Sequence, residues 1–509
     1  MPEPALVDSA PFAPCPAPFN LAAHVLAAAG RTPAKVALEV LSAPGVVAER
    51  WRYADLAEAV TRTAGGLAAL GVGRGDRVLI RIGNSSRFPV VFFAANALGA
   101  VPVPTSAMLT AGEVGAVIAA VRPRLVCLGE GLGLPDAPGV AVIGPAEVEA
   151  LRAHAPAAIA ATAPDDPAYM VMTSGSGGTP KGVLHAQRAA WARRMMWAGW
   201  YGLGEDDRML HTGAFNWTYT LGAGLTDPLA AGATALIYTG PADRHVWPAL
   251  AAAHGATLFA AAPGVYRQML DAPGLAAGFA GLRHGLSAGE ALPEAVRSAW
   301  SAATGKPIHE ALGMSEISTY VSGCPARPAP PGTTGFPQTG RRVAILPDDG
   351  AEPVRRGEDG LLAVSRRDPG LMLGYWQRPE ETAAAFRGEW FVTGDRARMG
   401  HDGSIAFLGR ADDLMNAGGF RVSPAEVEAV LLAHPGVAEA AAVDLPVASG
   451  ATVIAAFYVP RGEAVAETEL AAHCAARLAR YKTPRIFRAV DALPRTAMGK
   501  IARRRLREL

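Results

Sequence analysis

A stretch of glycines, hydroxyls and one lysine has the composition of a phosphate-binding loop. Thr173-Ser174-Gly175-Ser176-Gly177-Gly178-Thr179-Pro180-Lys181-Gly182 follows the apolar run 168–172. Glycines let backbone N–H groups approach and point at one anion, hydroxyls add donors, and lysine adds a mobile positive charge. The alternative reading is a mobile polar loop without a ligand.

The order of residues in this stretch excludes two well-known phosphate-binding loops. A Walker A loop needs Gly-Lys-Ser/Thr, but Lys181 lies between Pro180 and Gly182. A Rossmann GxGxxG that begins at Gly175 would need glycine where Pro180 stands. The stretch therefore predicts a phosphate site of a third type.

Composition and charge exclude several classes of protein. A chain of 509 residues should contain more than one structural unit. Its 47 basic and 46 acidic residues give a net charge of +1, so neither nucleic acid nor an acidic membrane is expected as a partner. Cys15, Cys127, Cys324 and Cys474 are scattered, which argues against a disulfide framework or a zinc site and fits a reducing cytoplasm.

Two segments have features that could suggest a targeting signal or a membrane span. Residues 1–20 are rich in proline and alanine without a basic start, so we expect a loosely attached arm rather than a secretory signal. Residues 88–112 carry no charge, but several prolines and polar residues interrupt them. We expect a buried helix over 90–98 and a buried strand over 100–103, and no membrane span.

The elements that must position the loop alternate between strands and helices. Up to about residue 169, and again from about 209 to 287, apolar strands alternate with alanine-rich helices, which predicts two doubly wound α/β units with mostly parallel sheets. The second series includes a helix expected near 220–230. Past about residue 332, glycines, prolines and short strands indicate antiparallel β structure. The last hundred or so residues are typical of a small α+β domain.

Six motifs in order resemble those of one family. Besides the glycine loop they are Ser287-Ala288-Gly289-Glu290, Gly313-Met314-Ser315-Glu316, Trp390-Phe391-Val392-Thr393-Gly394-Asp395, Gly409-Arg410-Ala411-Asp412-Asp413 through Gly418-Gly419-Phe420-Arg421, and Pro494-Arg495-Thr496-Ala497-Met498-Gly499-Lys500. From about residue 21 to residue 509 the chain resembles the adenylate-forming superfamily of acyl-CoA synthetases, stand-alone adenylation domains and beetle luciferase. The resemblance implies an arm (1–20), a large domain with two α/β subdomains and a small β subdomain (21–411), and a small mobile α+β domain (412–509).

The resemblance implies a reaction in two halves. A carboxylate attacks the α-phosphorus of ATP to give acyl-AMP and pyrophosphate, and a thiol, usually that of coenzyme A, then displaces AMP to give a thioester. The implied cofactors are ATP, Mg²⁺ and coenzyme A. Glu316 would bind the magnesium ion and Asp395 would accept hydrogen bonds from the ribose hydroxyls.

The same resemblance assigns the remaining nucleotide residues. Thr173, Ser174, Gly175, Ser176, Gly177, Gly178, Thr179 and Lys181 would hold the β- and γ-phosphates, and Gly289, Glu290, Leu312, Gly313, Met314, Ser315 and Arg410 would contact the nucleotide. Leu312 stands where relatives commonly carry an aromatic ring against adenine. Arg421 would pair with a phosphate in one of the two half-reactions.

The C-terminal motifs imply a moving domain. Lys500 would reach the α-phosphate and the carboxylate in the first half-reaction, Asp412 would be the hinge, and Gly418 and Gly419 would line the coenzyme A channel in the second. Lysines at the position of Lys500 are acylated in some relatives, so regulatory acylation is a hypothesis for this chain. A homodimer is a further hypothesis.

The candidate acyl pocket indicates a medium-sized acid. Its expected walls are Phe215, Asn216, Trp217 and Tyr219, with the segment 260–264, which includes Ala261, opposite. Gly313, where acetyl-CoA synthetases carry tryptophan, is expected to leave space open. No acidic residue occurs between Arg208 and Asp227, where amino-acid-activating relatives keep an aspartate for the substrate ammonium. We expect an uncharged aromatic or medium-chain acid.

Two other functions stay open at this point. An adenylation enzyme that loads a carrier protein would differ in its acceptor. A luciferase-like oxygenase would use the adenylate for oxidation.

Overall fold

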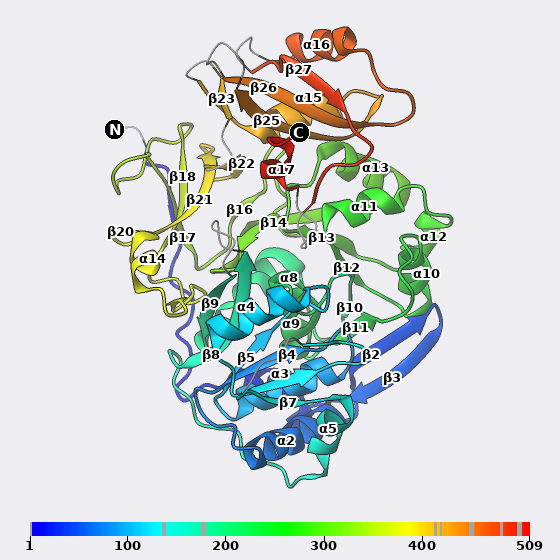
Figure 1. The fold of residues 1–509 in the computed structure, drawn as a ribbon, viewed down its shortest axis with the longest axis vertical. Coiled ribbons are helices and arrows are strands. Elements are labelled where there is room, and N and C mark those ends of the chain that lie inside the picture. The colour runs from blue at the N-terminus through cyan, green and yellow to red at the C-terminus, as the bar shows by residue number, and fades with distance from the viewer. Residues whose placement is uncertain are drawn as a thin grey trace.

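The computed structural model describes residues 3–134, 139–174, 180–411, 415–417, 420–446, 452–478, 482–495 and 501–509. A large body of sheets and helices forms most of the molecule, and a smaller unit made of C-terminal residues lies above it (Figure 1). The expected fold class, α/β with a small C-terminal α+β unit, is confirmed.

The first α/β unit contains a parallel four-stranded sheet. Its order is β5 (Val101–Pro104), β4 (Arg77–Arg81), β6 (Leu125–Leu128) and β7 (Ala141–Ile143), and its helices are α2 (Tyr53–Ala69), α3 (Arg87–Ala97), α4 (Ala111–Val121) and α5 (Pro145–Ala150), with the short η2 (Leu151–Ala153). Every residue of α3 from Phe88 onward is buried. The uncharged run therefore forms a core helix and strand, and no helix of the described residues is long and apolar enough to span a membrane.

The second α/β unit contains the largest sheet. Its nine strands lie in the order β16 (Phe336–Pro337), β15 (Ser318–Ser322), β14 (Ile308–Met314), β13 (His284–Ala288), β12 (Leu258–Ala261), β10 (Arg208–His211), β11 (Thr234–Tyr238), β2 (Val36–Ala43) and β3 (Val46–Arg52). β2 precedes the first sheet in sequence but pairs in parallel with β11 of the second. Because β10 to β14 are parallel to one another, their carboxyl ends meet at one edge, where ligands of such sheets usually bind.

Helical elements cover both faces of this sheet. One face packs on α10 (Val246–Ala253), α11 (Pro263–Met269), α12 (Leu275–Gly278) and α13 (Glu294–Thr304). The opposite face packs on η3 (Trp197–Tyr201), α8 (Thr218–Leu221) and η4 (Gly222–Thr226). Nearby lie α1 (Leu21–Val25), η1 (Ala27–Gly30), α6 (Arg188–Ala192), α7 (Arg194–Met196) and α9 (Asp227–Ala231). The single helix expected near residues 220–230 is therefore three segments, because the π-helical turn η4 separates α8 from α9.

Two further sheets complete the body. A six-stranded antiparallel sheet contains β1 (Leu6–Asp8), β17 (Arg342–Leu346), β18 (Asp359–Ser365), β21 (Trp390–Met399), β20 (Phe386–Arg387) and β22 (Ile405–Arg410). A small sheet contains β19 (Gly374–Tyr375), β9 (Pro180–Ala186) and β8 (Pro167–Ser174), next to α14 (Pro379–Ala384). The expectation of a loosely attached N-terminal arm is wrong for this segment, because β1 pairs with β17 and Ala5 is fully buried.

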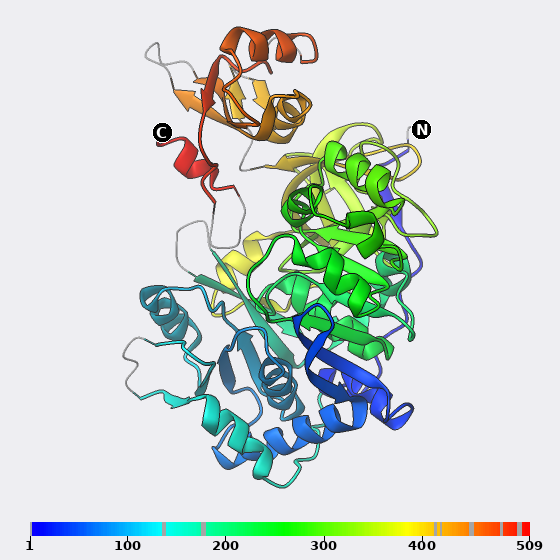
Figure 2. The ribbon, with the colours of Figure 1, turned by 90° about the vertical axis from the view of Figure 1, so that its right-hand side faces the viewer.

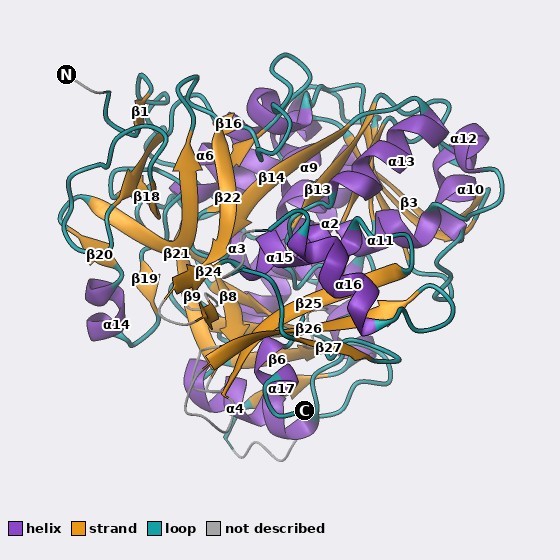
Figure 3. Cartoon of the chain, turned by 90° about the horizontal axis from the view of Figure 1, so that it is seen from above, coloured by secondary structure: helices purple, strands orange, loops and turns teal. Residues whose placement is uncertain are grey.

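The C-terminal unit has buried clusters of its own. It consists of β23 (Met415–Ala417), β24 (Phe420–Val422), α15 (Pro424–Leu432), β25 (Val437–Pro446), β26 (Thr452–Pro460), α16 (Glu467–Ala475), β27 (Ile486–Ala489) and α17 (Arg503–Leu506). Apolar residues of β25 and β26 pack on α15 and α16 on one face of the sheet and on α17 on the other. Figures 2 and 3 show this unit stacked over the body, with α16 on the side away from it.

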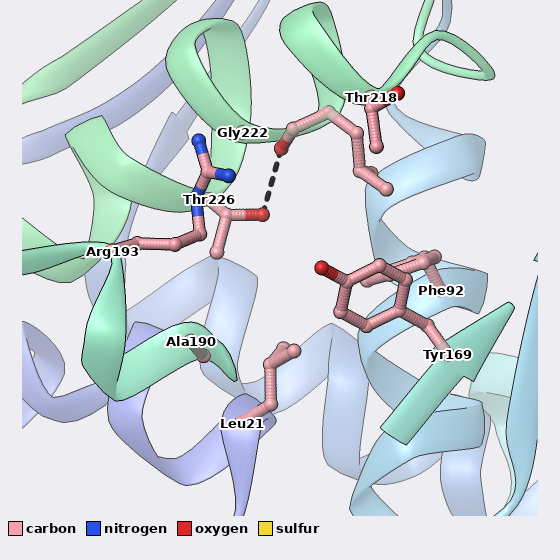
Figure 4. Close-up of a pocket in the computed structure, with 9 residues that line it drawn as sticks. Leu21, Phe92, Tyr169, Ala190, Arg193, Thr218, Gly222 and Thr226 are labelled. Carbon is pink, nitrogen blue, oxygen red and sulfur yellow. Dashed lines mark hydrogen bonds between the residues drawn. The ribbon is translucent and has the colours of Figure 1, made fainter. Parts of the chain in front are cut away.

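A buried ion pair ties helical segments of the body together. Arg193, between α6 and α7, donates to both carboxylate oxygens of Asp227 at 2.8 and 2.6 Å, and the Tyr201 hydroxyl donates to the same carboxylate at 2.8 Å. In Figure 4 the Arg193 guanidinium points toward Gly222 and Thr226 at the edge of a small cavity. A Cβ added at Gly222 would lie 1.8 Å from Arg193 Nη2, so glycine is required there.

We expect Asp227→Ala to lower the free energy of unfolding by about 3 to 5 kcal/mol, because it leaves the Arg193 charge buried without its partner. Urea unfolding followed by tryptophan fluorescence measures the loss. Asp206→Ala, at an exposed position, is the control and should change stability little. Equal stability of the two variants would contradict a structural role for the pair.

Candidate active site

Glu316 lies in a turn that is fixed from three sides. The turn joins β14 to β15, and Ser318 at its end has a positive φ of 68°. His185 Nε2 donates to the Ser315 carbonyl at 2.8 Å, the Met372 N–H donates to the Glu316 carbonyl at 2.8 Å, and Arg193 donates to the Ser318 hydroxyl. Burial lowers the pKa of His185 to about 4, so its ring is neutral near pH 7 and donates through Nε2. These contacts fix the backbone of the turn from which the Glu316 side chain extends.

The Glu316 carboxylate is buried and has a neutral partner. Its Oε1 accepts a hydrogen bond from the Tyr375 hydroxyl at 2.9 Å. Burial, and then the charge of Glu316, raise the pKa of Tyr375 well above its usual range, so this hydroxyl stays a donor. Within the described ranges, no lysine or arginine forms an ion pair with Glu316. A buried carboxylate with a second oxygen to offer and no cationic side chain is suited to a hard divalent cation such as Mg²⁺.

Lys181 reaches the same group of residues from the glycine loop. Lys181, on β9, pairs across the sheet with Thr173 on β8. Its Nζ lies 3.9 Å from the centre of the Tyr375 ring and 3.1 Å from Glu381 Oε2. Tyr375 thus touches both the lysine of the loop and the carboxylate of Glu316. The end of the glycine loop and the proposed magnesium ligand are therefore neighbours in space.

Tyr375 and Glu381 were not predicted from the sequence. The available signal was a short segment that contains a glycine, an aromatic residue and an acidic helix start, Gly374-Tyr375 followed by Pro379-Glu380-Glu381. This segment lies next to the loop only because β19 pairs with β9. Nothing in the sequence indicates that pairing.

Asp395 and Arg410, both predicted from the sequence, lie together. They face each other on β21 and β22, and Arg410 Nη1 is 3.1 Å from Asp395 Oδ1 and 3.0 Å from the Thr393 carbonyl. Gly394 has a φ of +76°, and a Cβ there would lie 2.9 Å from the Arg410 side chain. The Asp395 carboxylate is buried, so its orientation is fixed before any ligand binds.

Trp217 connects the predicted acyl wall with the predicted nucleotide residues. A Cβ at Gly289, whose φ is +99°, would lie 2.6 Å from the Trp217 ring. Trp217 also meets Tyr219 edge to face, with ring centroids 5.2 Å apart. The Tyr219 hydroxyl donates to the Leu286 carbonyl at 3.1 Å, which fixes this ring against β13. Glu290, beyond Gly289, is exposed.

Two predicted acyl-pocket residues lie elsewhere. Phe215 stacks on Phe88 at 5.0 Å and belongs to the core of the first α/β unit. Ala261 faces the layer of α10 to α13, whereas its neighbour Ala260 faces Tyr219. Because side chains alternate along a strand, Ala260 of the expected wall 260–264 lies beside Tyr219 and Ala261 does not. Asn216 is half-buried.

The expectation that Gly313 leaves acyl space open is also wrong. A Cβ at Gly313 would lie 2.5 Å from the Ser318 carbonyl oxygen and 2.7 Å from Thr319 Cα. The space next to Gly313 is therefore filled by the backbone of β15. Leu312 and Met314, on either side, pack partly against the buried cluster around Ile317.

Several predicted residues lie outside the described residues. They are Gly175, Ser176, Gly177, Gly178 and Thr179 of the glycine loop, the hinge residue Asp412, Gly418 and Gly419, and Lys500. Ser174 and Arg421 are described through the backbone of β8 and β24 only.

Comparison with known proteins identifies the family. Residues 25–376 match the AMP-binding enzyme family, and residues 426–500 match the AMP-binding enzyme C-terminal domain. The chain is 34% identical over 478 residues to a 3-hydroxybenzoate–CoA ligase of Aromatoleum sp. (strain CIB), covering 90% of this chain and 91% of that protein. It is also 34% identical over 485 residues to a benzoate–CoA ligase of Thauera aromatica, covering 90% of each chain.

Solved structures of related enzymes superimpose on nearly the whole chain. The anthranilate CoA ligase AuaEII in complex with anthranoyl-AMP superimposes with a TM-score of 0.87 at 28% identity, covering 97% of this chain and 98% of that one. ATP-bound MatB from Rhodopseudomonas palustris gives 0.87 and apo MatB gives 0.79, each at 27% identity and covering 96% of this chain and 98% of that one. The chain therefore belongs to the AMP-binding enzyme family and is an adenylate-forming acid–thiol ligase of the acyl-CoA synthetase type.

Proposed function

We propose that the protein joins an uncharged aromatic carboxylic acid of benzoate type to coenzyme A in the cytoplasm. The observation that carries this proposal is the position of Trp217, which lies against Gly289 beside the nucleotide motifs and meets Tyr219 edge to face. The names of the relatives, a 3-hydroxybenzoate–CoA ligase and a benzoate–CoA ligase, support the same acid class. Four free cysteines fit a reducing compartment.

Small and aromatic side chains support an aromatic acid rather than a charged one. Trp217 and Tyr219 share an apolar cluster with Ala223, Ala260 and Ala288 on one face of the large sheet. Flat aromatic surface beside alanines is suited to a planar ring.

Asp227, the first acidic residue after Tyr219 in the sequence, is held by Arg193 through both carboxylate oxygens. A substrate ammonium would lack a counter-charge there, which disfavours an α-amino acid.

The first half-reaction forms one bond and breaks another at phosphorus. A carboxylate oxygen of the acid attacks the α-phosphorus of ATP, and the bond to the β-phosphate breaks to release pyrophosphate. Glu316 would hold Mg²⁺, which neutralises phosphate charge when it is bound. Asp395 would accept hydrogen bonds from the ribose hydroxyls. Lys181 would exchange Glu381 for the more highly charged β- and γ-phosphates.

The second half-reaction releases AMP. The sulfur of coenzyme A attacks the carbonyl carbon of the acyl-adenylate, and the bond from that carbon to the phosphate oxygen breaks. Gly418 and Gly419 would line the path of the thiol after the C-terminal unit has rotated about Asp412. Small residues at such a path allow a close approach of the backbone.

The acid class is tested by pyrophosphate release with acetate, octanoate, benzoate, 3-hydroxybenzoate and cinnamate, with and without coenzyme A. We expect the largest kcat/KM for benzoate or a hydroxybenzoate and thioester formation with free coenzyme A. Removing Mg²⁺ with EDTA should stop the reaction. If octanoate is turned over fastest, the substrate is a fatty acid and the proposed aromatic class is wrong. If free coenzyme A does not accept the acyl group, the acceptor is a carrier protein.

We expect Lys500→Ala to lower acyl-AMP formation by about 10²- to 10³-fold, the usual effect of losing one preorganised donor. Supplied acyl-AMP should still be converted to thioester, because Lys500 is proposed to act only in the first half-reaction. ATP–pyrophosphate exchange and thioester formation measure the two halves separately. An equal loss in both would contradict this role.

We expect Gly313→Trp to lower thermal stability and activity on all acids, rather than shift preference to acetate. Its Cβ would lie 2.5 Å from the Ser318 oxygen, so β15 would have to move. Gly462→Trp is the control, since nothing lies within 4 Å of its Cβ position. A stable Gly313→Trp variant that prefers acetate would show that Gly313 borders the acid after all.

A further inference from the structure

One carboxylate joins the C-terminal unit to the body. Glu439, on β25, accepts a hydrogen bond from Arg267 at 2.8 Å through Oε1 and from Arg495 at 2.7 Å through Oε2. Arg267 belongs to α11 of the body, whereas Arg495 belongs to the C-terminal unit. The Arg267–Glu439 pair therefore crosses between the two parts, and the Glu439–Arg495 pair lies within one of them.

Arg495 stands at the base of the segment that contains Lys500. Arg495 and Ile501, the described residues on either side of 496–500, pair in an isolated antiparallel bridge. Ile501 packs against the buried cluster of the C-terminal sheet. The base of this segment is thus held on the sheet that carries Glu439. Any contact that fixes this sheet relative to the body also fixes the base of the Lys500 segment.

On the other side, α11 is firmly attached to the large sheet. The Tyr266 hydroxyl, next to Arg267, lies 3.0 Å from the Phe259 carbonyl and 3.1 Å from the Leu286 carbonyl. Leu286 is the residue that also accepts the hydrogen bond from Tyr219. Arg267 therefore extends from a helix fixed to the strands that form the proposed acid wall. In Figure 1 the red stretch that follows β27 passes α11, to which Arg495 is linked through Glu439.

The pair occurs in an arrangement that resembles a nucleotide-bound relative. The chain superimposes better on ATP-bound MatB than on apo MatB, with TM-scores of 0.87 and 0.79 over the same share of each chain. An ion pair that exists in only one of two domain arrangements favours that arrangement by its own free energy.

We propose that Glu439 is a positioning residue that couples the Lys500 segment to α11 and so favours the arrangement for adenylate formation. The inference rests on the proposed function, in which Lys500 acts in the first half-reaction and leaves before the second. Rotation of the C-terminal unit would break the Arg267–Glu439 pair and keep the Glu439–Arg495 pair. Because the three side chains are 26% to 34% exposed, we expect an effect of roughly 3- to 10-fold on the equilibrium between the arrangements.

The test compares Arg267→Gln, Glu439→Gln and the double variant with the wild-type enzyme. ATP–pyrophosphate exchange with benzoate reports the first half-reaction, and thioester formation from supplied benzoyl-AMP reports the second. We expect each single variant to lower exchange about 3- to 10-fold with the second half-reaction unchanged or faster. The double variant should lose no more exchange activity than Glu439→Gln alone, because both substitutions remove the same Arg267–Glu439 pair.

Two controls separate positioning from general damage. Arg267→Lys should restore part of the exchange, since it keeps the charge. Glu469→Gln should have no effect, because Glu469 pairs with His434 inside the C-terminal unit, at 3.1 Å. Raising the salt concentration should lower exchange in the wild-type enzyme more than in Arg267→Gln, since exposed charges are screened.

Three outcomes would overturn the inference. They are unchanged exchange in both single variants, an equal fall in both half-reactions, and additive losses in the double variant. Absence of exchange in the wild-type enzyme with every acid of the panel would overturn the proposed function and this inference together. Wild-type exchange with unaffected variants would overturn the positioning role alone.

Discussion

The buried pair of Arg193 and Asp227 holds together the segments from which the site is built. Arg193 sits between α6 and α7, contacts the Asp227 carboxylate through two nitrogens and reaches the Ser318 hydroxyl at the start of β15. Burial disfavours its charge, but Asp227 together with Tyr201 and Tyr169 outweighs burial, so the pKa of Arg193 is raised. The arginine fills the space that Gly222 leaves, so the π-helical turn η4 and the turn that carries Glu316 share one support. A buried charge with fixed partners suits this task because its geometry cannot relax without loss of the partner.

The site itself lies where three sheets meet. Glu316 follows β14 of the nine-stranded sheet, Asp395 lies on β21 of the six-stranded sheet, and Lys181 lies on β9 of the small sheet. Tyr375 links two of them, because its hydroxyl donates to Glu316 and its ring lies beneath Lys181. Separate sheets would hold the proposed cation-binding, sugar-binding and phosphate-binding groups independently, while the proposed rotation of the C-terminal unit would bring in and remove a further group.

Sequence reasoning succeeded where a local pattern decides the structure and failed where packing decides it. The strand expected over 100–103 occurs as β5, and the uncharged run around α3 is a core helix, because apolar runs of those lengths have few alternatives. The acyl wall was harder to predict, since a strand presents alternate residues to opposite faces and the sequence does not say which face is which. Ala260 rather than Ala261 therefore faces Tyr219, and Phe215 turns into the first core.

By itself the sequence determined the family, the order of its motifs and the chemistry of adenylate formation, because those depend on residue types such as Glu316, Asp395 and Lys500 that stand in recognisable local strings. Only the tertiary structure decided which residues touch. It brought Tyr375 to Glu316 through the pairing of β19 with β9, filled the space beside Gly313 with the backbone of β15, and placed Glu439 between arginines of two different parts of the chain. These contacts join residues that are distant in sequence, so no local pattern records them.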